Sequence, residues 1–181
     1  NELDNQFAHL KRLVKEYLVI DEDITMEVLV GRLLKERGET VTTAESCTGG
    51  YIAHLITSVP GSSVYFSGSV VSYDNNIKKN ILNVREDTLQ TAGAVSEETV
   101  IQMLKGVLKI MQTNYAIAVS GIMGPDGGTP NKPVGTVWIG VGNGQSIETK
   151  KMHFRFDRKR NIELTAINAL NLLRLFILKQ S

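Results

Sequence analysis

The stretch that decides the fold is Thr42–Gly50, which reads TTAESCTGG. It follows a short β-branched run and precedes an apolar helical pattern, so it predicts a turn from a strand into a helix. Unpaired N–H groups at a helix start attract anions such as a phosphate or a developing oxyanion. This turn carries the Ser46 hydroxyl, the Cys47 thiol and the Glu45 carboxylate. On this stretch alone, capping of the helix by Ser46 or Thr48 explains the pattern at least as well as catalysis does.

Helical and extended patterns alternate on both sides of this turn. Apolar residues recur at helical spacing from Leu3 to Tyr17, which predicts an amphipathic helix over residues 2–18. Further helices are predicted at 25–37, 50–57, 76–82, 96–112 and from Asp157 onward, with Gly38 as a stop and Ser96 and Asp157 as caps. Strands are predicted at 41–45, 64–73, 115–120, 135–141 and 146–156.

This order of elements predicts an α/β fold. Strands separated by helices form parallel pairs, whereas the last two strands are joined by a short Gly142-Asn143-Gly144 turn and form an antiparallel hairpin. We therefore expect a three-layer α/β/α sandwich with a mixed sheet, plus an extra N-terminal helix. Residues 1–24 are assigned to an N-terminal helical extension and residues 25–181 to the domain itself.

The composition narrows the class of protein. A chain of 181 residues with 42% hydrophobic and 22% charged residues fits one globular domain with a proper core. A formal net charge of +1 gives no support for nucleic-acid binding. Cys47 is the only cysteine, so an internal disulfide is impossible and a reducing compartment is expected. Neither a membrane-spanning apolar run nor a secretory leader is recognised, so we expect a cytoplasmic protein with no membrane partner.

Ser46 is a candidate nucleophile, and a serine hydroxyl needs a base. The histidines offer little support for a Ser-His-Asp triad. His9 and His54 fall inside predicted helices and His153 in an alternating strand, where histidines are more often surface or packed residues.

A lysine can act as the base when burial or a neighbouring cation lowers its pKa. Lys78 and Lys79 follow Tyr73, where a predicted strand gives way to a helix and site residues gather in layered α/β folds. Taken alone, the sequence favours solvated surface residues at both positions. Cys47 is a rival nucleophile, because a thiol at a helix start can have a lowered pKa, but cysteine is also a common buried residue.

A second loop, Ser120–Gly128, follows a buried strand and reads SGIMGPDGG. Its glycines allow close approach of the backbone to a ligand, although its spacing fits neither a Walker A loop nor a dinucleotide-binding fingerprint. Arg158 lies just past the last strand and could pair with a phosphate or be an exposed first-turn arginine. No clustered His, Cys or carboxylate set at ligand spacing indicates a metal.

Several motifs together resemble a known family. They are TTAESCTGG (42–50), PGSS (60–63), YDNNIK (73–78), GAVSE (93–97), SGIMGPDGG (120–128) and KPVGTVW (132–138). In this order and at these distances they resemble the C-terminal amidase domain of CinA and its stand-alone form, PncC. The resemblance covers residues 33–178. It implies hydrolysis of the amide of nicotinamide mononucleotide, a small-molecule nucleotide substrate, to nicotinic acid mononucleotide and ammonia. We expect no cofactor and no metal, and a homo-oligomer.

The resemblance also implies roles for individual residues. Ser46 would attack the carboxamide carbon, Lys78 would be the base and later the acid, and Tyr73 would orient Lys78 or the substrate. Thr48, Gly49 and Gly50 would supply oxyanion or phosphate donors, while Thr48, Ser120 and Arg158 would contact the ribose phosphate. The complete set of expected substrate-binding residues is Glu45, Thr48, Gly49, Gly50, Ser120, Gly121, Gly124 and Arg158.

The chain departs from the family pattern near the predicted lysine base. Asp74-Asn75-Asn76-Ile77 replaces the usual Ser-Asn-Glu-Ala, so a glutamate is missing at Asn76 and the pKa of Lys78 would change. Ile77 and Met123 are larger than the usual residues and would reshape the pocket. An alternative to the amidase is therefore a catalytically weak or inactive nucleotide-binding or interaction module of the same fold. A thiol enzyme that depends on Cys47 is a third possibility.

Overall fold

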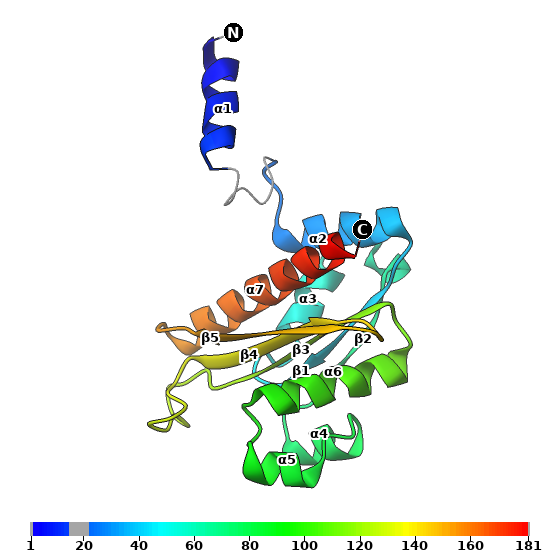
Figure 1. The fold of residues 1–181 in the computed structure, drawn as a ribbon, viewed down its shortest axis with the longest axis vertical. Coiled ribbons are helices and arrows are strands. Elements are labelled where there is room, and N and C mark those ends of the chain that lie inside the picture. The colour runs from blue at the N-terminus through cyan, green and yellow to red at the C-terminus, as the bar shows by residue number, and fades with distance from the viewer. Residues whose placement is uncertain (1, 15–21, 181) are drawn as a thin grey trace.

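The computed structural model describes residues 2–14 and 22–180. Figure 1 shows a sheet with helices above and below it. The helices are α1 (Glu2–Leu13), α2 (Met26–Arg37), α3 (Tyr51–Thr57), α4 (Asn75–Asn80), α5 (Glu86–Thr91), α6 (Glu97–Met111) and α7 (Arg158–Lys179), with a 3₁₀ turn, η1, at Ser62–Val64. The strands are β1 (Val41–Glu45), β2 (Phe66–Val71), β3 (Tyr115–Gly121), β4 (Thr136–Gly142) and β5 (Ile147–His153).

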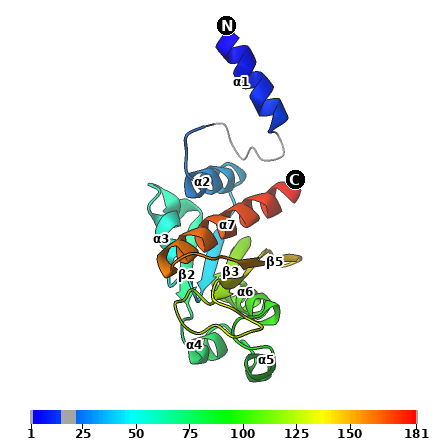
Figure 2. The same cartoon turned by 90° about the vertical axis from the view of Figure 1, so that its left-hand side faces the viewer.

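The five strands form one mixed sheet in the order β2-β1-β3-β4-β5. β1 is parallel to both β2 and β3, whereas β4 is antiparallel to β3 and to β5. Helices α2, α3 and α7 lie on one face of the sheet and α6 on the other, with α4 and α5 beyond α6 (Figures 1 and 2). The predicted three-layer α/β/α sandwich with a mixed sheet is confirmed.

Local signals explain where several elements begin and end. Gly38 adopts a left-handed conformation (φ 63°) and its N–H bonds the last carbonyls of α2, as a glycine stop should. The Ser96 side chain accepts the N–H of Thr99 at the start of α6, and the Asp157 side chain accepts the N–H of Arg160 at the start of α7. The predicted helix over 2–18 is present as α1, and its part beyond residue 14 lies outside the described residues.

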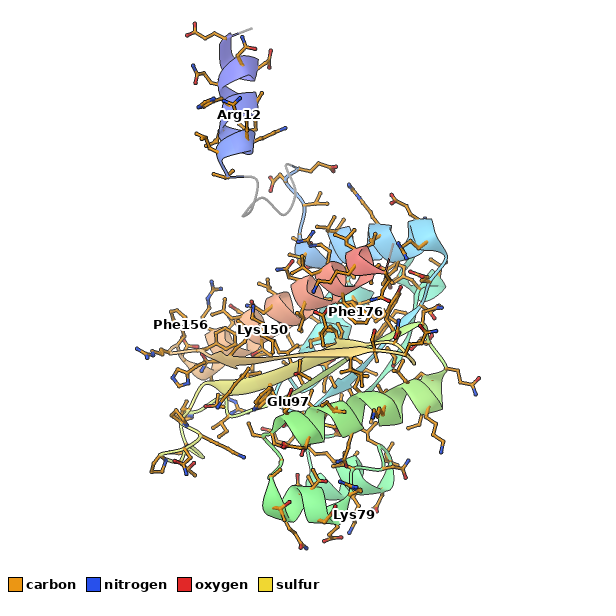
Figure 3. All side chains as sticks on the ribbon, in the orientation of Figure 1. Arg12, Lys79, Glu97, Lys150, Phe156 and Phe176 are labelled. Atoms are coloured by element: carbon orange, nitrogen blue, oxygen red, sulfur yellow. The ribbon has the colours of Figure 1, made fainter. Side chains whose placement is uncertain are left out.

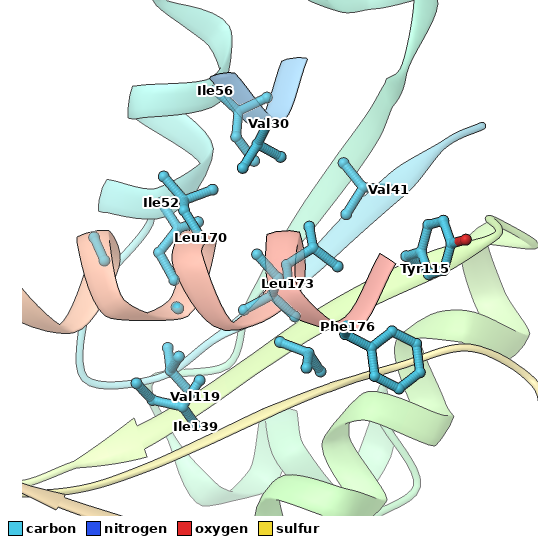
Figure 4. Packing of buried hydrophobic residues seen from close by; sticks show 14 of the residues in the cluster. Val30, Val41, Ile52, Ile56, Tyr115, Val119, Ile139, Leu170, Leu173 and Phe176 are labelled. Carbon is cyan, nitrogen blue, oxygen red and sulfur yellow. The ribbon is translucent and has the colours of Figure 1, made fainter. Parts of the chain in front are cut away.

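The core has two layers because β3 is covered on both faces. Ile117 and Val119 of β3 face the cluster under α2, α3 and α7, which Figure 4 shows with Leu170, Leu173 and Phe176 of α7. Ala116 and Ala118 of β3 face the second cluster, under α6. These alternate positions follow the period of two in a strand. The alternation therefore assigns aliphatic side chains to one helical layer and small alanines to the other.

The structure corrects two predicted elements. β2 is shorter than the strand predicted over 64–73, because η1 occupies its start and its last residues turn toward α4. α5 was not predicted, since a helix of six residues has too few turns to show a helical period. It is held by tertiary contact instead: the Gln102 side-chain amide of α6 donates to the Thr88 hydroxyl.

α7 has the length and apolar composition of a membrane span. However, 44% of its most apolar window is buried inside the domain, where eight residues of the helix pack toward the sheet. The packing of α7 on the sheet therefore explains its apolar composition, because a core helix is apolar where it is buried.

Candidate active site

The carboxyl ends of β1, β2 and β3 meet at one edge of the sheet, where ligands bind in layered α/β folds. A cavity of about 230 Å³ lies there. It is lined by Ser46, Cys47, Tyr73, Asn75, Lys78, Ala94, Val95, Ser120, Gly121, Met123 and Arg158. The structure thus brings together the three predicted catalytic residues, Ser46, Lys78 and Tyr73, from segments that are far apart in the sequence.

Ser46 lies directly after β1 and is 8% exposed. Its backbone N–H donates to the carbonyl of Val119 on β3 (3.1 Å), and its own carbonyl accepts the N–H of Gly49 (3.2 Å). Within the described part of the chain, the Ser46 hydroxyl forms no hydrogen bond. The backbone is therefore held on both sides while the hydroxyl stays available to a ligand.

The carboxylate of Glu45 occupies the start of α3. Glu45 is fully buried, and its side-chain oxygens accept the N–H groups of Gly50 (3.1 Å), Ile52 (3.0 Å) and Ala53 (2.8 Å). It also accepts the Thr48 hydroxyl (2.7 Å). The anion site that the sequence predicted at this helix start is filled by the protein's own carboxylate. Glu45 therefore faces the helix rather than the cavity.

This arrangement changes what the turn can offer a ligand. Gly50 is the N-cap of α3, so neither Ser46 nor Thr48 caps the helix as the sequence had suggested. The N–H of Gly50 is already donated to Glu45. Among the described residues, the N–H groups of Cys47 and Thr48 donate to no other residue. Of the two residues, only Cys47 lines the cavity with Ser46, so its N–H is the candidate oxyanion donor.

Thr48, Gly49 and Gly50 do not line the cavity that holds Ser46. They line a separate hollow of about 390 Å³ together with residues of α3 and α7. The remaining members of this second hollow are Tyr51, His54, Lys159, Ile162 and Glu163. Thr48, Gly49 and Gly50 therefore share no cavity lining with Ser46, and their predicted contacts with substrate stay a prediction.

Lys78 is buried in α4, with only 1% of its surface exposed. Its Nζ donates to the carbonyls of Ser72 (2.7 Å) and Tyr73 (3.2 Å). Burial lowers the pKa of Lys78, and the nearby Cys47 and Asp74 oppose that shift. A lowered pKa increases the fraction of Lys78 that is in the neutral amine form, which is the form that can act as a base.

Lys79 has the opposite environment. Its Nζ forms an exposed ion pair with Glu86 at 2.7 Å. Figure 3 labels Lys79 on the outer side of the domain. The sequence left both lysines open as surface residues or as a base. The structure buries Lys78 in the cavity wall and leaves Lys79 at the surface.

Tyr73 and Arg158 form the rim of the cavity. The Arg158 Nη2 donates to the Tyr73 hydroxyl (2.8 Å), and Nη1 donates to the carbonyl of Gly124 (2.8 Å). Gly124 adopts φ 87°, a conformation that favours glycine. Gly124 therefore does not line the cavity, and its link to the site is its hydrogen bond with Arg158. Of the other residues predicted in this loop, Ser120 is buried and its hydroxyl donates to the carbonyl of Ala94 (2.7 Å), which also lines the cavity.

Asn161 supports the cavity wall and was not identified from the sequence. It is fully buried in α7, and its side-chain amide donates to the carbonyls of Met123 and Phe156, both at 3.0 Å. These bonds hold the loop that carries Met123 against the start of α7. The sequence shows only a polar residue next to the apolar Ile162. It does not show that Asn161 is buried, because that depends on partners that are distant in sequence.

The alternatives to a serine–lysine pair are weaker in this geometry. Burial raises the pKa of the Cys47 thiol to about 12, so the reactive thiolate is disfavoured at neutral pH. None of the described residues that line the cavity is a histidine, and His54 lines the second hollow instead. Among the described residues, no group of three His, Cys, Asp or Glu side chains could hold a metal ion.

Comparison with known proteins agrees with this architecture. The family described as the CinA C-terminal domain matches residues 23–177. The chain belongs to the CinA family. CinA-like proteins of Cytophaga hutchinsonii and Thermotoga maritima are 46% and 45% identical over 96% and 97% of the chain. These matches cover 41% and 43% of the two relatives, so the chain spans about two fifths of their length.

Solved structures of the CinA superfamily share the fold. A Klebsiella pneumoniae protein of this superfamily has a TM-score of 0.82 and 35% identity over 85% of the chain and 96% of its own length. The competence/damage inducible protein CihA of Agrobacterium tumefaciens has a TM-score of 0.80 and 36% identity over 85% and 98%. The names of these relatives state no reaction.

Proposed function

We propose that the chain is an amidohydrolase that converts nicotinamide mononucleotide to nicotinic acid mononucleotide and ammonia. The observation that carries the proposal is the presence of the Ser46 hydroxyl and the buried Lys78 amine in the wall of one cavity. An amide is a poor electrophile, so its hydrolysis needs an activated nucleophile, stabilisation of the oxyanion and a proton for the leaving amine. The cavity offers a group for each requirement.

The first half of the reaction forms an ester. Neutral Lys78 takes the proton of Ser46 as the Ser46 oxygen attacks the carboxamide carbon. The N–H group of Cys47, which lines the cavity, donates to the oxygen that becomes negative. When the tetrahedral intermediate collapses, the C–N bond breaks and protonated Lys78 gives its proton to the departing ammonia.

The second half releases the acid. Water attacks the ester carbon while Lys78 accepts a proton from it, and the bond from the carbon to the Ser46 oxygen breaks. Lys78 then returns the proton to Ser46, and the carboxylic acid so formed passes its own proton to the released ammonia. One water is consumed, and one carboxylate and one ammonium are formed, so atoms and charge balance.

Arg158 supports a nucleotide rather than free nicotinamide as the substrate. A guanidinium has five N–H donors, and two atoms of Arg158 are engaged by Tyr73 and Gly124. The remaining donors stay at the rim, where a phosphate outside the cavity would meet them. The cavity volume of about 230 Å³ lies below that of ordinary ligand pockets, so only part of a nucleotide would enter it.

The decisive experiment measures ammonia release from nicotinamide mononucleotide in metal-free buffer, with free nicotinamide as a control substrate. We expect wild type to release ammonia from the nucleotide alone and Ser46→Ala to release none. Ser63→Ala, at an exposed serine, is the matched control and should keep full activity. Cys47→Ala should also remain active, which separates the serine mechanism from a thiol mechanism.

A nucleotide-binding module without activity is the second candidate. Met123 favours it, because this larger residue does line the cavity, whereas Asn76 and Ile77 do not. Wild type that binds nicotinamide mononucleotide without releasing ammonia would select this candidate. In that case Met123→Ala, which restores the usual family residue, is the first variant to test for recovered activity.

A further inference from the structure

The Ser120 hydroxyl belongs to the cavity wall, and its single proton is already used by the protein. Ser120 is 1% exposed and lines the cavity that holds Ser46 and Lys78. Its hydroxyl donates to the carbonyl of Ala94 at 2.7 Å, and Ala94 lines the same cavity. A serine hydroxyl has one proton to donate and two lone pairs that accept. Because the proton is directed at Ala94, Ser120 offers a ligand only its lone pairs.

The position of Ser120 on β3 holds the hydroxyl in this orientation. Side chains alternate along a strand, so Ser120 shares the face of Ala116 and Ala118, which pack under α6. Ala94 lies in the turn that leads into α6, and the hydroxyl meets its carbonyl there. Among the described residues, no other group donates to the Ala94 carbonyl, and none donates to the Ser120 hydroxyl oxygen. Turning the hydroxyl toward a ligand would therefore leave a part-buried carbonyl without its donor.

The charges in the cavity favour a carboxylate over a carboxamide. Among the described residues that line the cavity, Lys78 and Arg158 carry positive charge and none is Asp or Glu. A carboxylate, the product of the proposed reaction, would be attracted by both cations. A carboxamide has no charge, but its NH₂ group has two protons to donate. Only an acceptor in the wall can therefore favour the substrate over its product.

Ser120 is the acceptor with a fixed direction. Asn75 also lines the cavity, but its side-chain amide can present either its oxygen or its NH₂ group to a ligand. It therefore accommodates a carboxamide and a carboxylate alike. The Ser120 oxygen cannot change its role in this way while the hydrogen bond to Ala94 is kept.

We propose that Ser120 selects the carboxamide of the substrate by accepting one of its N–H groups, and that it disfavours the carboxylate of the product. This inference rests on the proposed amidase function. In the amide complex, the substrate NH₂ donates to the Ser120 oxygen while the substrate carbonyl faces the N–H of Cys47. In the acid complex, a carboxylate oxygen takes the place of the NH₂ and meets the Ser120 lone pairs. The product then lacks this hydrogen bond, or Ser120 gives up its bond to Ala94.

This role differs from the phosphate contact that the family resemblance implies for Ser120. A phosphate accepts hydrogen bonds, so it needs donors. A hydroxyl whose proton is held by the Ala94 carbonyl has none to give. The contact therefore suits the amide end of the nucleotide better than its phosphate end.

The test compares the binding of substrate and product in a protein that does not convert one into the other. In the Ser46→Ala background, isothermal titration calorimetry at neutral pH gives the Kd of nicotinamide mononucleotide and of nicotinic acid mononucleotide. We expect the ratio of Kd for the acid to Kd for the amide to fall about tenfold when Ser120→Ala is added, the size of one lost hydrogen bond. Ser120→Thr, which keeps the hydroxyl, should keep the ratio. An unchanged ratio in Ser120→Ala would overturn the inference.

Thr99→Val is the matched control for a displaced turn. The Thr99 hydroxyl donates to the carbonyl of Gly93 (2.8 Å), the residue before Ala94, but Thr99 does not line the cavity. This variant loosens the same turn without removing a group from the cavity wall. It should change both dissociation constants by the same factor and leave their ratio as it was. A ratio that falls as far as in Ser120→Ala would assign the effect to the turn and refute the role of Ser120.

Ammonia release by the wild type separates this inference from the proposed function. A wild type that releases ammonia, with a ratio that Ser120→Ala leaves unchanged, refutes the inference alone. The expected fall in the ratio together with an inactive wild type refutes the activity alone. A protein that binds neither nucleotide refutes both.

Discussion

The Lys78 ammonium donates a 2.7 Å hydrogen bond to the carbonyl of Ser72, the residue directly after β2. The Ser72 N–H in turn donates to the carbonyl of Glu45 at the end of β1 (2.8 Å). Lys78 is therefore tied through one residue to the strand that leads into Ser46. The lysine side chain is long and flexible, but this hydrogen bond holds its amine at the cavity.

Lys78→Met should lower kcat/KM for ammonia release by about 10²- to 10⁴-fold, the usual contribution of a general base. Only neutral Lys78 can accept a proton, and burial lowers its pKa from the ordinary value of 10.5. In the wild type, kcat/KM should therefore rise with pH, with a midpoint below 10.5. The measurement is a pH profile of both proteins.

Lys79→Met is the matched control, because Lys79 is the neighbouring lysine and its side chain is 39% exposed. It should keep both the rate and the pH midpoint of the wild type. A wild-type profile that is flat with pH, or one shared by the Lys78 variant, would contradict the assignment of Lys78 as the base.

Glu45→Ala should destabilise the fold by roughly 3 kcal/mol or more. Three backbone N–H groups lose their acceptor, and each buried donor left unsatisfied costs about 1–3 kcal/mol. Urea unfolding measures the change, with Glu36→Ala at an exposed position of α2 as the control. Glu45→Ala with wild-type stability would show that water replaces the carboxylate at the start of α3.

Arg158→Lys should raise KM for the nucleotide about tenfold with a smaller effect on kcat. A lysine cannot bridge the Tyr73 hydroxyl and the Gly124 carbonyl at once, so the rim loses at least one charge-assisted bond worth about 1.5–3 kcal/mol. Steady-state kinetics measure the effect, and Arg155→Lys at an exposed site is the control. A change confined to kcat would assign Arg158 to the chemical step instead.

Gly106→Ala should destabilise the domain by about 1–3 kcal/mol. A Cβ at Gly106 would lie 2.0 Å from the backbone carbonyl oxygen of Leu82, so α6 or the segment after α4 must shift. Because Lys78 lies on α4, we also expect a lower rate. Thermal unfolding measures the first effect. Gly144→Ala, which would meet nothing within 4 Å, should leave the melting temperature unchanged; equal melting temperatures of both variants would contradict the close packing.

The elements that the sequence predicted well are those with local signals. β1 has the bounds that were predicted for it, 41–45, and α6 and α7 begin directly after the predicted caps Ser96 and Asp157. These signals lie within a few residues of the feature that they determine. α5 was missed, because its position depends on the contact of Thr88 with Gln102 rather than on its own pattern.

The sequence by itself determined the α/β class, the caps and the presence of Ser46 at a strand-to-helix turn, since periodicity and capping are local properties of the chain. Only the tertiary structure decided that Lys78 is buried while the Lys79 side chain stays 39% exposed, and that the Glu45 carboxylate accepts N–H groups of its own helix. Burial and hydrogen bonding join segments that are distant in sequence. No local pattern states which of two adjacent lysines the packed core will enclose.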